Sequence, residues 1–189
     1  MYEYISGKLA SLTAANAVVD CGGVGYLMEI TLTTYAAIQE KQEVRLWVHE
    51  VIREDAHLLY GLGTTAEREM FRLLLGVNGV GAATARMMLS SLSVEELTEA
   101  IASQDAKLVQ RVKGVGAKTA QRIVLELQDK VAGMGVMPTA APAASRNKEE
   151  ALAALVILGF PQAAAGKVLQ KLDGALSVEE LIKEALKRI

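Results

Sequence analysis

The segment Arg111–Arg122 reads RVKGVGAKTAQR, and it decides how the middle of this 189-residue chain folds. A Gly-Val-Gly turn stands there between two stretches that have the residue pattern of helices. Glycine allows a tight turn whose backbone comes close to a ligand. The free N–H groups at the start of the next helix, together with the helix dipole, favour an anion. The segment is therefore predicted to be a hairpin of two helices that binds a phosphate.

Two nucleotide-binding motifs fit this segment poorly. A P-loop has the pattern G-x-x-x-x-G-K-[ST] after a strand. Here Ala117 separates Gly116 from Lys118, and the preceding residues, DAKLVQRV, have a helical pattern. The dinucleotide-binding fingerprint fails as well, because no strand precedes the glycines. The phosphate is therefore predicted to belong to a nucleic acid backbone, which positions a protein without specifying bases.

A second copy of the pattern lies 35 residues upstream. Val77–Leu89 reads VNGVGAATARMML and matches VKGVGAKTAQRIV at Val112–Val124. One such turn alone is often only a connection between helices, whereas two copies, each followed by A-[AK]-T-A, indicate a repeated device. The pair resembles the helix-hairpin-helix motif of DNA-binding proteins. That resemblance implies that the two hairpins bind the two strands of one duplex across its minor groove, with Val80 and Val115 anchored in the core.

The two copies differ in charge. The second copy has Lys118 and Arg122, one turn apart on the same predicted helix face, and both could reach phosphates. The first copy has Ala83 and Met87 at the matching positions, with Arg86 nearby. The first hairpin is therefore expected to rely more on backbone N–H groups. The sequence leaves open whether Arg86 compensates or whether this hairpin binds less well.

Composition and charge limit the function further. The only cysteine, Cys21, excludes an intramolecular disulfide and a zinc site built on several cysteines of one chain. No signal peptide or membrane span is evident, so a soluble cytoplasmic protein is expected. The net charge is −2, and residues 1–63 hold four basic and eight acidic side chains. Nucleic-acid binding must therefore be confined to a local site.

The chain divides into four predicted parts. Residues 1–63 contain short strand-like segments, typical of a small β-barrel. Residues 64–132 have helical periodicity and contain both hairpins. Residues 133–146 are rich in Gly, Ala and Pro and are predicted to be a flexible linker. Residues 147–189 are helical again and form a third, very small unit. The predicted fold class is therefore α+β with several domains.

Catalysis is not expected from these residues. The strongest alternative is a helix-hairpin-helix DNA glycosylase, for which Lys118 would be the catalytic lysine. Such enzymes also need a downstream aspartate, and none occurs between Lys130 and Ser145. His49 and His57 belong to no recognisable catalytic constellation, and no cofactor or metal is expected. A single-strand-binding barrel protein is a second alternative, but it would need stacking aromatics, and these are only 4% of the residues.

An acidic turn completes the pattern. The segment VIREDAHLLYG places Arg53, Glu54 and Asp55 between two strand patterns, where a solvated hairpin tip is the ordinary interpretation. Taken together, the parts of the chain resemble the RuvA family. These parts are a barrel with this turn and a GGVGY turn at Gly22–Tyr26, paired GVG hairpins, a linker and a terminal helical module. Members of that family bind Holliday junctions in bacterial recombination and repair. The resemblance extends over essentially the whole chain, in order.

The resemblance implies a role for each part. The barrel is expected to be an OB-fold that assembles a homotetramer, with Glu54 and Asp55 forming an acidic pin near its axis. The central part is expected to be a tandem helix-hairpin-helix domain. The phosphate-binding residues implied are Asn78, Gly79, Val80, Gly81, Thr84, Arg86, Lys113, Gly114, Val115, Gly116, Lys118, Thr119 and Arg122.

The same resemblance implies that residues 147–189 form a UBA-like three-helix domain that binds the hexameric AAA+ ATPase RuvB. The chain itself would then be a non-catalytic scaffold for four-way junction DNA, with the RuvC resolvase as a further partner. One tetramer or two facing tetramers remain open. The residues expected to contact the motor are Leu155, Leu158, Gly159, Phe160 and Leu169.

Overall fold

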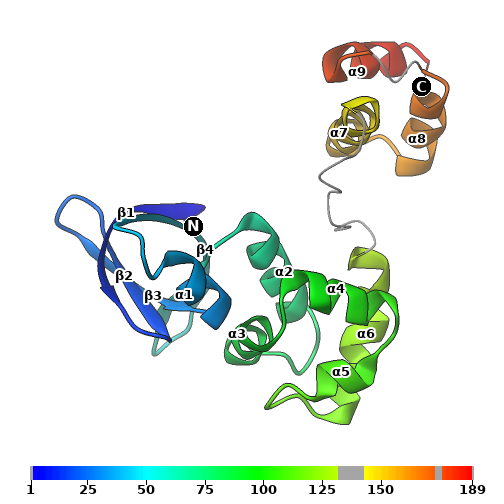
Figure 1. Ribbon diagram of the computed structural model, residues 1–189. Coiled ribbons are helices and arrows are strands. Elements are labelled where there is room, and N and C mark those ends of the chain that lie inside the picture. Colours follow the sequence, from blue (N-terminus) through cyan, green and yellow to red (C-terminus); the bar gives the residue numbers. More distant parts are fainter. Residues whose placement is uncertain (1, 132–142, 173–175, 189) are drawn as a thin grey trace. The chain divides into compact units, whose positions relative to one another are not determined.

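The structure is a computed structural model that describes residues 2–131, 143–172 and 176–188. It consists of two compact units, Met1–Val136 and Met137–Ile189. The first unit contains a β-barrel followed by helices, and the second contains helices alone (Figure 1). This arrangement confirms the predicted α+β fold class.

The first unit begins with a closed five-stranded barrel, with strand order β1-β2-β3-β5-β4. Neighbouring strands are antiparallel except β3 and β5, which are parallel. One helix, α1, stands between β3 and β4, which is the arrangement of an OB-fold. The elements are β1 (Tyr4–Leu12), β2 (Asn16–Asp20), β3 (Gly25–Ile30), α1 (Leu32–Ile38), β4 (Glu43–Ile52) and β5 (His57–Leu62).

The barrel core follows from alternation along the strands. Val44, Leu46 and Val48 of β4 are buried, while Arg45 between them is exposed. Successive side chains of a strand point to opposite faces, so the alternation seen in the sequence places the apolar set inside. The buried barrel core consists of Ile5, Ala17, Val19, Met28, Ile30, Ile38, Val44, Leu46 and Val48.

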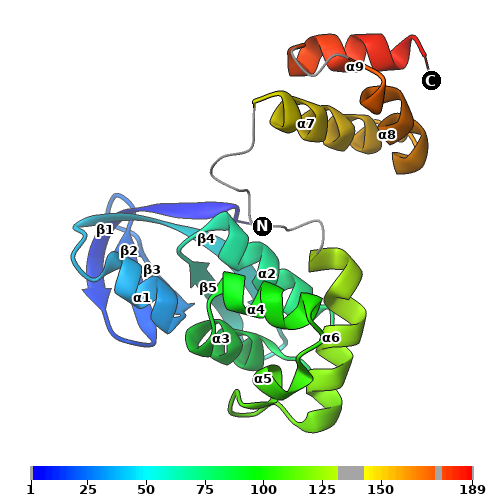
Figure 2. The same cartoon turned by 45° about the vertical axis from the view of Figure 1, so that its right-hand side comes forward.

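Within residues 64–131, which the structure describes, five helices follow the barrel. They are α2 (Thr65–Leu75), α3 (Ala82–Ser91), α4 (Val94–Ala102), α5 (Ala106–Gln110) and α6 (Ala117–Val131). Ser93 and Glu96 form a capping box at the start of α4. The turns from α2 to α3 and from α5 to α6 carry the two GVG segments. Figure 2 shows the turn between α5 and α6 at the lower edge of this unit, with α6 running upward from it.

The barrel and these helices share one compact unit, although the sequence suggested a boundary at Gly63. The buried carboxylate of Glu67 on α2 accepts hydrogen bonds from the hydroxyls of Thr31 and Thr34 and from the N–H of Gly63. A buried carboxylate requires such partners. Because Thr31 caps α1, the network joins the first turn of α2 to the barrel helix.

Arg68 makes a second connection between α2 and the barrel. Its buried guanidinium donates to the carbonyl oxygen of Glu3 at 2.9 Å and to the Glu3 carboxylate at 2.7 Å. It also lies over the Trp47 ring, 5.1 Å from the centroid. The hydrogen bond from Arg68 lowers the pKa of Glu3 below its ordinary value. The barrel is thus tied to the hairpin helices by charged groups as well as by the shared apolar core.

The second unit is a three-helix domain made of α7 (Ala143–Ile157), α8 (Gln162–Gln170) and α9 (Val178–Leu186). The predicted linker is corrected here. Its residues 133–142 lie outside the described part, whereas residues 143–146 belong to α7, which starts four residues earlier than predicted. Alanine and arginine favour helix, so these residues extend the helix that was predicted to begin at Asn147.

Candidate nucleic-acid interface

Each hairpin turns at a glycine with positive φ. Gly79 has φ +92° and Gly114 has φ +91°. Residues with a Cβ rarely adopt this conformation, so glycine is required at both positions. The near-identical angles show that the two sequence copies fold into the same local structure.

The middle valines anchor the hairpins, as the sequence predicted. Val80 and Val115 are buried in the core formed by α2–α6. The N–H of Val80 donates to the carbonyl of Val77 at 3.0 Å, and the N–H of Val115 donates to Val112 at 3.1 Å. The turn backbone is thereby closed, and the neighbouring glycines remain at the surface.

The surface in front of the hairpins is open. A Cβ built on Gly81, Gly114 or Gly116 would meet no atom within 4 Å. Gly81 is the N-cap of α3 and supplies no side-chain cap, so the first N–H groups of α3 have no acceptor from that residue. Open backbone and uncapped N–H groups are what an approaching phosphate oxygen requires.

The structure brings the two hairpins side by side. Arg122 on α6 donates from Nη1 to the carbonyl oxygen of Asn78 in the first hairpin, at 2.9 Å. A Cβ at Gly79 would lie 3.8 Å from Oγ1 of Thr119. The two candidate phosphate sites thus form one surface.

The predicted phosphate-binding residues differ in exposure. Asn78, Gly79, Gly81, Lys113, Gly114, Gly116, Lys118 and Arg122 are exposed, Thr84, Arg86 and Thr119 are half-buried, and Val80 and Val115 are buried. The side chains of Val80 and Val115 are therefore unavailable to a phosphate, so only their backbone groups could take part.

Arg86 is directed to the barrel. Its Nη1 lies 3.3 Å from a carboxylate oxygen of Glu29 and donates to the carbonyl oxygen of Ala15 at 3.2 Å. The sequence placed Arg86 near the first hairpin as a possible replacement for the missing lysine. In the structure this guanidinium instead holds α3 against the barrel, because Glu29 on β3 offers it a carboxylate.

The acidic turn is a tight connection between β4 and β5. The N–H of Arg53 donates to the carbonyl of Ala56 at 2.8 Å, which closes the turn. Glu54 and Asp55 form its exposed tip. Among the described residues neither carboxylate has an ion-pair partner, so both charges face the surroundings of the hairpin.

The base of this acidic hairpin contains both histidines. His57 Nε2 lies 2.6 Å from Oε1 of Glu50 across the two strands. His49 packs on Phe71 with ring centroids 5.4 Å apart, and burial lowers its pKa, with a further contribution from Arg72. His49 therefore stays neutral at neutral pH and does not offset the acidic tip.

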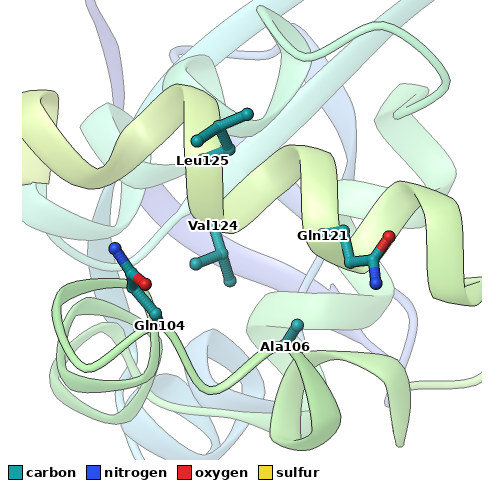
Figure 3. A pocket seen from close by; sticks show the side chains of 5 residues that line it. All are labelled: Gln104, Ala106, Gln121, Val124 and Leu125. Atoms are coloured by element: carbon teal, nitrogen blue, oxygen red, sulfur yellow. The ribbon is translucent and has the colours of Figure 1, made fainter.

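A shallow pocket of about 390 Å³ lies beside α6 (Figure 3). Its lining consists of Gln104, Ala106, Gln121, Val124 and Leu125. None of these side chains titrates, so the pocket offers no acid or base. Within the described ranges, no group of three or more histidine, cysteine or acidic side chains could hold a metal ion. No helix in the same ranges is both long and apolar enough to cross a membrane.

Comparison with known proteins agrees with this geometry. Residues 1–61 match the model of the RuvA N terminal domain, residues 71–129 match the SAM-like helix-hairpin-helix tandem, and residues 146–189 match the RuvA C-terminal domain. The chain is 46% identical to a curated protein of Christiangramia forsetii and 46% identical to one of Bacteroides thetaiotaomicron, each over 100% of both chains. Both carry the name Holliday junction branch migration complex subunit RuvA.

The chain belongs to the RuvA family. A relative from Flavobacterium psychrophilum with the same name is 41% identical, again over 100% of both chains. The helix-hairpin-helix match lies between the matches to the N-terminal and C-terminal RuvA domains. This is the order of parts that the sequence predicted.

In this RuvA family member the predicted motor-contacting residues fall into two groups. Leu155 and Leu169 are buried in the core of the three-helix unit, so their prediction as contact residues is corrected. Leu158 is 60% exposed, Gly159 is exposed with φ +95°, and Phe160 is half-buried. The sequence missed Ile157, the most exposed large apolar residue of the described chain at 85%.

The RuvA-type barrel also exposes apolar residues. Leu27 on β3 and Leu32 at the start of α1 are 61% and 50% exposed, and Val24 beside them in sequence is exposed as well. Exposed apolar surface of this kind often marks a protein–protein contact. Leu27 lies in a strand, where alternation alone does not distinguish an outward apolar residue from a core residue.

Proposed function

We propose that this chain is a non-catalytic scaffold for Holliday junctions, working in the cytoplasm in recombination and repair. It holds the four-way junction open and positions a motor for branch migration. The observation that carries this proposal is the single surface formed by two GVG hairpins with open backbone and exposed Lys118 and Arg122. Such a surface contacts phosphates on two strands without specifying bases.

The acidic hairpin supplies the preference for a junction. In a homotetramer, Glu54 and Asp55 of each subunit would surround the centre where four DNA arms meet. A carboxylate and a phosphate about 10 Å apart repel by roughly 0.4 kcal/mol in water, and salt limits the reach to about 8–10 Å. A ring of such charges disfavours continuous duplex at the centre and favours separated strands. The exposed Leu27 and Leu32 support assembly through the barrel.

The C-terminal unit is the proposed binding site for the motor, RuvB. Val156, Ile157 and Leu158 present adjacent exposed apolar side chains at the end of α7. Exposed apolar side chains on so small a unit are consistent with a contact site for a partner. The names of the relatives describe them as subunits of a complex, which supports a second component.

Replacing Lys118 with alanine is expected to weaken junction binding and to reduce its salt dependence. Each phosphate contact contributes about −0.9 to the slope of log K against log salt. The magnitude of the slope should therefore decrease by about one unit per subunit. Lys130→Ala is the matched control, because Lys130 lies at the far end of the same helix. Fluorescence anisotropy between about 50 and 200 mM salt measures the slope. An unchanged slope for Lys118→Ala would remove this lysine from the interface.

Ile157→Asp is expected to abolish motor recruitment while junction binding stays unchanged. A charge in the middle of an apolar contact costs several kcal/mol when it is desolvated. The residue is almost fully exposed, so the substitution leaves the three-helix core intact. Co-sedimentation of RuvB with the junction complex measures recruitment, and Glu150→Ala, exposed on the same helix, is the control. Full recruitment by Ile157→Asp would place the motor contact elsewhere.

A further inference from the structure

The first hairpin has no lysine or arginine directed toward its turn from its own second helix. Ala83 and Met87 occupy the positions that correspond to Lys118 and Arg122. Arg86 is the only basic residue of α3, and Glu29 and Ala15 of the barrel region hold its guanidinium. The backbone of the first hairpin is nevertheless open at Gly81, as that of the second is at Gly114 and Gly116.

Arg122 from the second hairpin fills this position. One guanidinium nitrogen, Nη1, donates to the carbonyl oxygen of Asn78 at 2.9 Å, and Nε lies 3.7 Å from the carboxylate of Glu126. The Arg122 side chain is 47% exposed. Among the described residues Nη2 has no hydrogen-bond partner, and its two N–H groups can donate to a phosphate.

The chemistry of arginine suits a double contact at this position. A guanidinium offers five N–H donors in a fixed plane, so one edge can bind the carbonyl while another remains free for an anion. Glu126, one helical turn away on α6, restrains the guanidinium from its Nε side. Thr119 on the same helix lies next to Gly79, so the two turns are close together.

We infer that Arg122 is a residue shared by both hairpins. It fixes the first hairpin against the second through Asn78, and it supplies the first phosphate site with the cation that α3 lacks. The two sites therefore bind DNA as one coupled unit instead of as two independent hairpins. This inference deepens the proposed function and rests on it.

The test restores a cation to the first hairpin. Ala83 is exposed at the second position of α3, which matches the position of Lys118 on α6, so Ala83→Lys gives the first hairpin its own lysine. This substitution is made in the wild type, in Arg122→Ala and in Lys118→Ala. Binding to a four-way junction and to one duplex arm is measured by anisotropy, and the unfolding midpoint of each variant is recorded.

If Arg122 serves the first hairpin, the added lysine is largely redundant wherever Arg122 is present. We expect Ala83→Lys to improve binding about tenfold in Arg122→Ala, the size of one charge-assisted contact, and less than about threefold in the other two backgrounds. Independent sites would instead give equal improvements in all three backgrounds, because distant effects add. Equal improvements, or a larger one in Lys118→Ala, would overturn the inference.

A purely structural role for Arg122 gives a different pattern. Both roles lower the unfolding midpoint of Arg122→Ala, but under a purely structural role Ala83→Lys would not restore binding selectively. Arg122→Gln is made in parallel, because it removes the charge and keeps an amide donor, and it replaces Arg122→Ala if that variant unfolds. A wild type that binds duplex and junction equally would contradict the proposed function, whereas the comparison on duplex would still test the coupling.

Discussion

Valine in place of both Gly79 and Gly114 is expected to weaken junction binding by more than about 100-fold, which corresponds to about 2.7 kcal/mol. Both glycines have φ near +90°, where a residue with a Cβ costs about 1–3 kcal/mol each. A β-branched residue is especially unfavourable there. The cost is local to the backbone, because a Cβ at either position would find no atom of the surrounding residues closer than 3.8 Å. The turn would relax to another conformation and misdirect the N–H groups that follow it.

Anisotropy with a labelled junction measures this effect, and circular dichroism checks that the helices persist. Gly166→Ala is a suitable control, because this glycine has ordinary φ in α8 and open space around it. Alanine should stabilise that helix by up to about 1 kcal/mol and leave DNA binding unchanged. Wild-type affinity in the Gly79→Val, Gly114→Val protein would show that the hairpin turns do not form the DNA site.

Neutralising the acidic tip with Glu54→Gln and Asp55→Asn should tighten duplex binding about tenfold and reduce the preference for a junction. Eight carboxylates in a tetramer, each repelling phosphate by roughly 0.4 kcal/mol at about 10 Å, give about 3 kcal/mol before screening. Salt removes part of this repulsion, so the gain should shrink as ionic strength rises.

Competition between labelled junction and unlabelled duplex measures the preference directly. Glu40→Gln is the control, because it removes an exposed barrel carboxylate away from the tip. If the double substitution leaves the ratio of junction to duplex affinity unchanged, Glu54 and Asp55 have no role in selecting the junction.

Local patterns in the sequence predicted much of the architecture. The short strand-like segments of residues 1–63 predicted a small barrel, and the repeated Gly-Val-Gly turns predicted two hairpins with buried valines. Both depend on residues close together in the chain. The burial of Glu67 could have been predicted from the sequence. Glu67 shares the helical spacing of Met70, Phe71 and Leu74 and therefore faces inward.

Other features depend on contacts that a single sequence does not encode locally. The ion pair of Arg86 with Glu29 joins a helix to a strand far away in the chain, and so does the hydrogen bond from Arg122 to Asn78 across the hairpins. The exposure of residues along α7 was also not predicted. Eight successive apolar residues, ALAALVIL, precede Gly159, so their periodicity does not distinguish the buried Leu155 from the exposed Ile157.

The most direct test of the scaffold proposal is a competition experiment with three DNA forms. The chain is bound to a labelled four-way junction and challenged with unlabelled duplex or single strand of the same sequence, and the mass of the complex is determined. The proposal predicts that the labelled junction stays bound in the presence of about a 100-fold excess of either competitor, a difference in binding free energy of about 2.7 kcal/mol. It also predicts complexes that contain four or eight copies of the chain. Displacement by equal amounts of duplex, a preference for single strands, or a complex with one copy would contradict it.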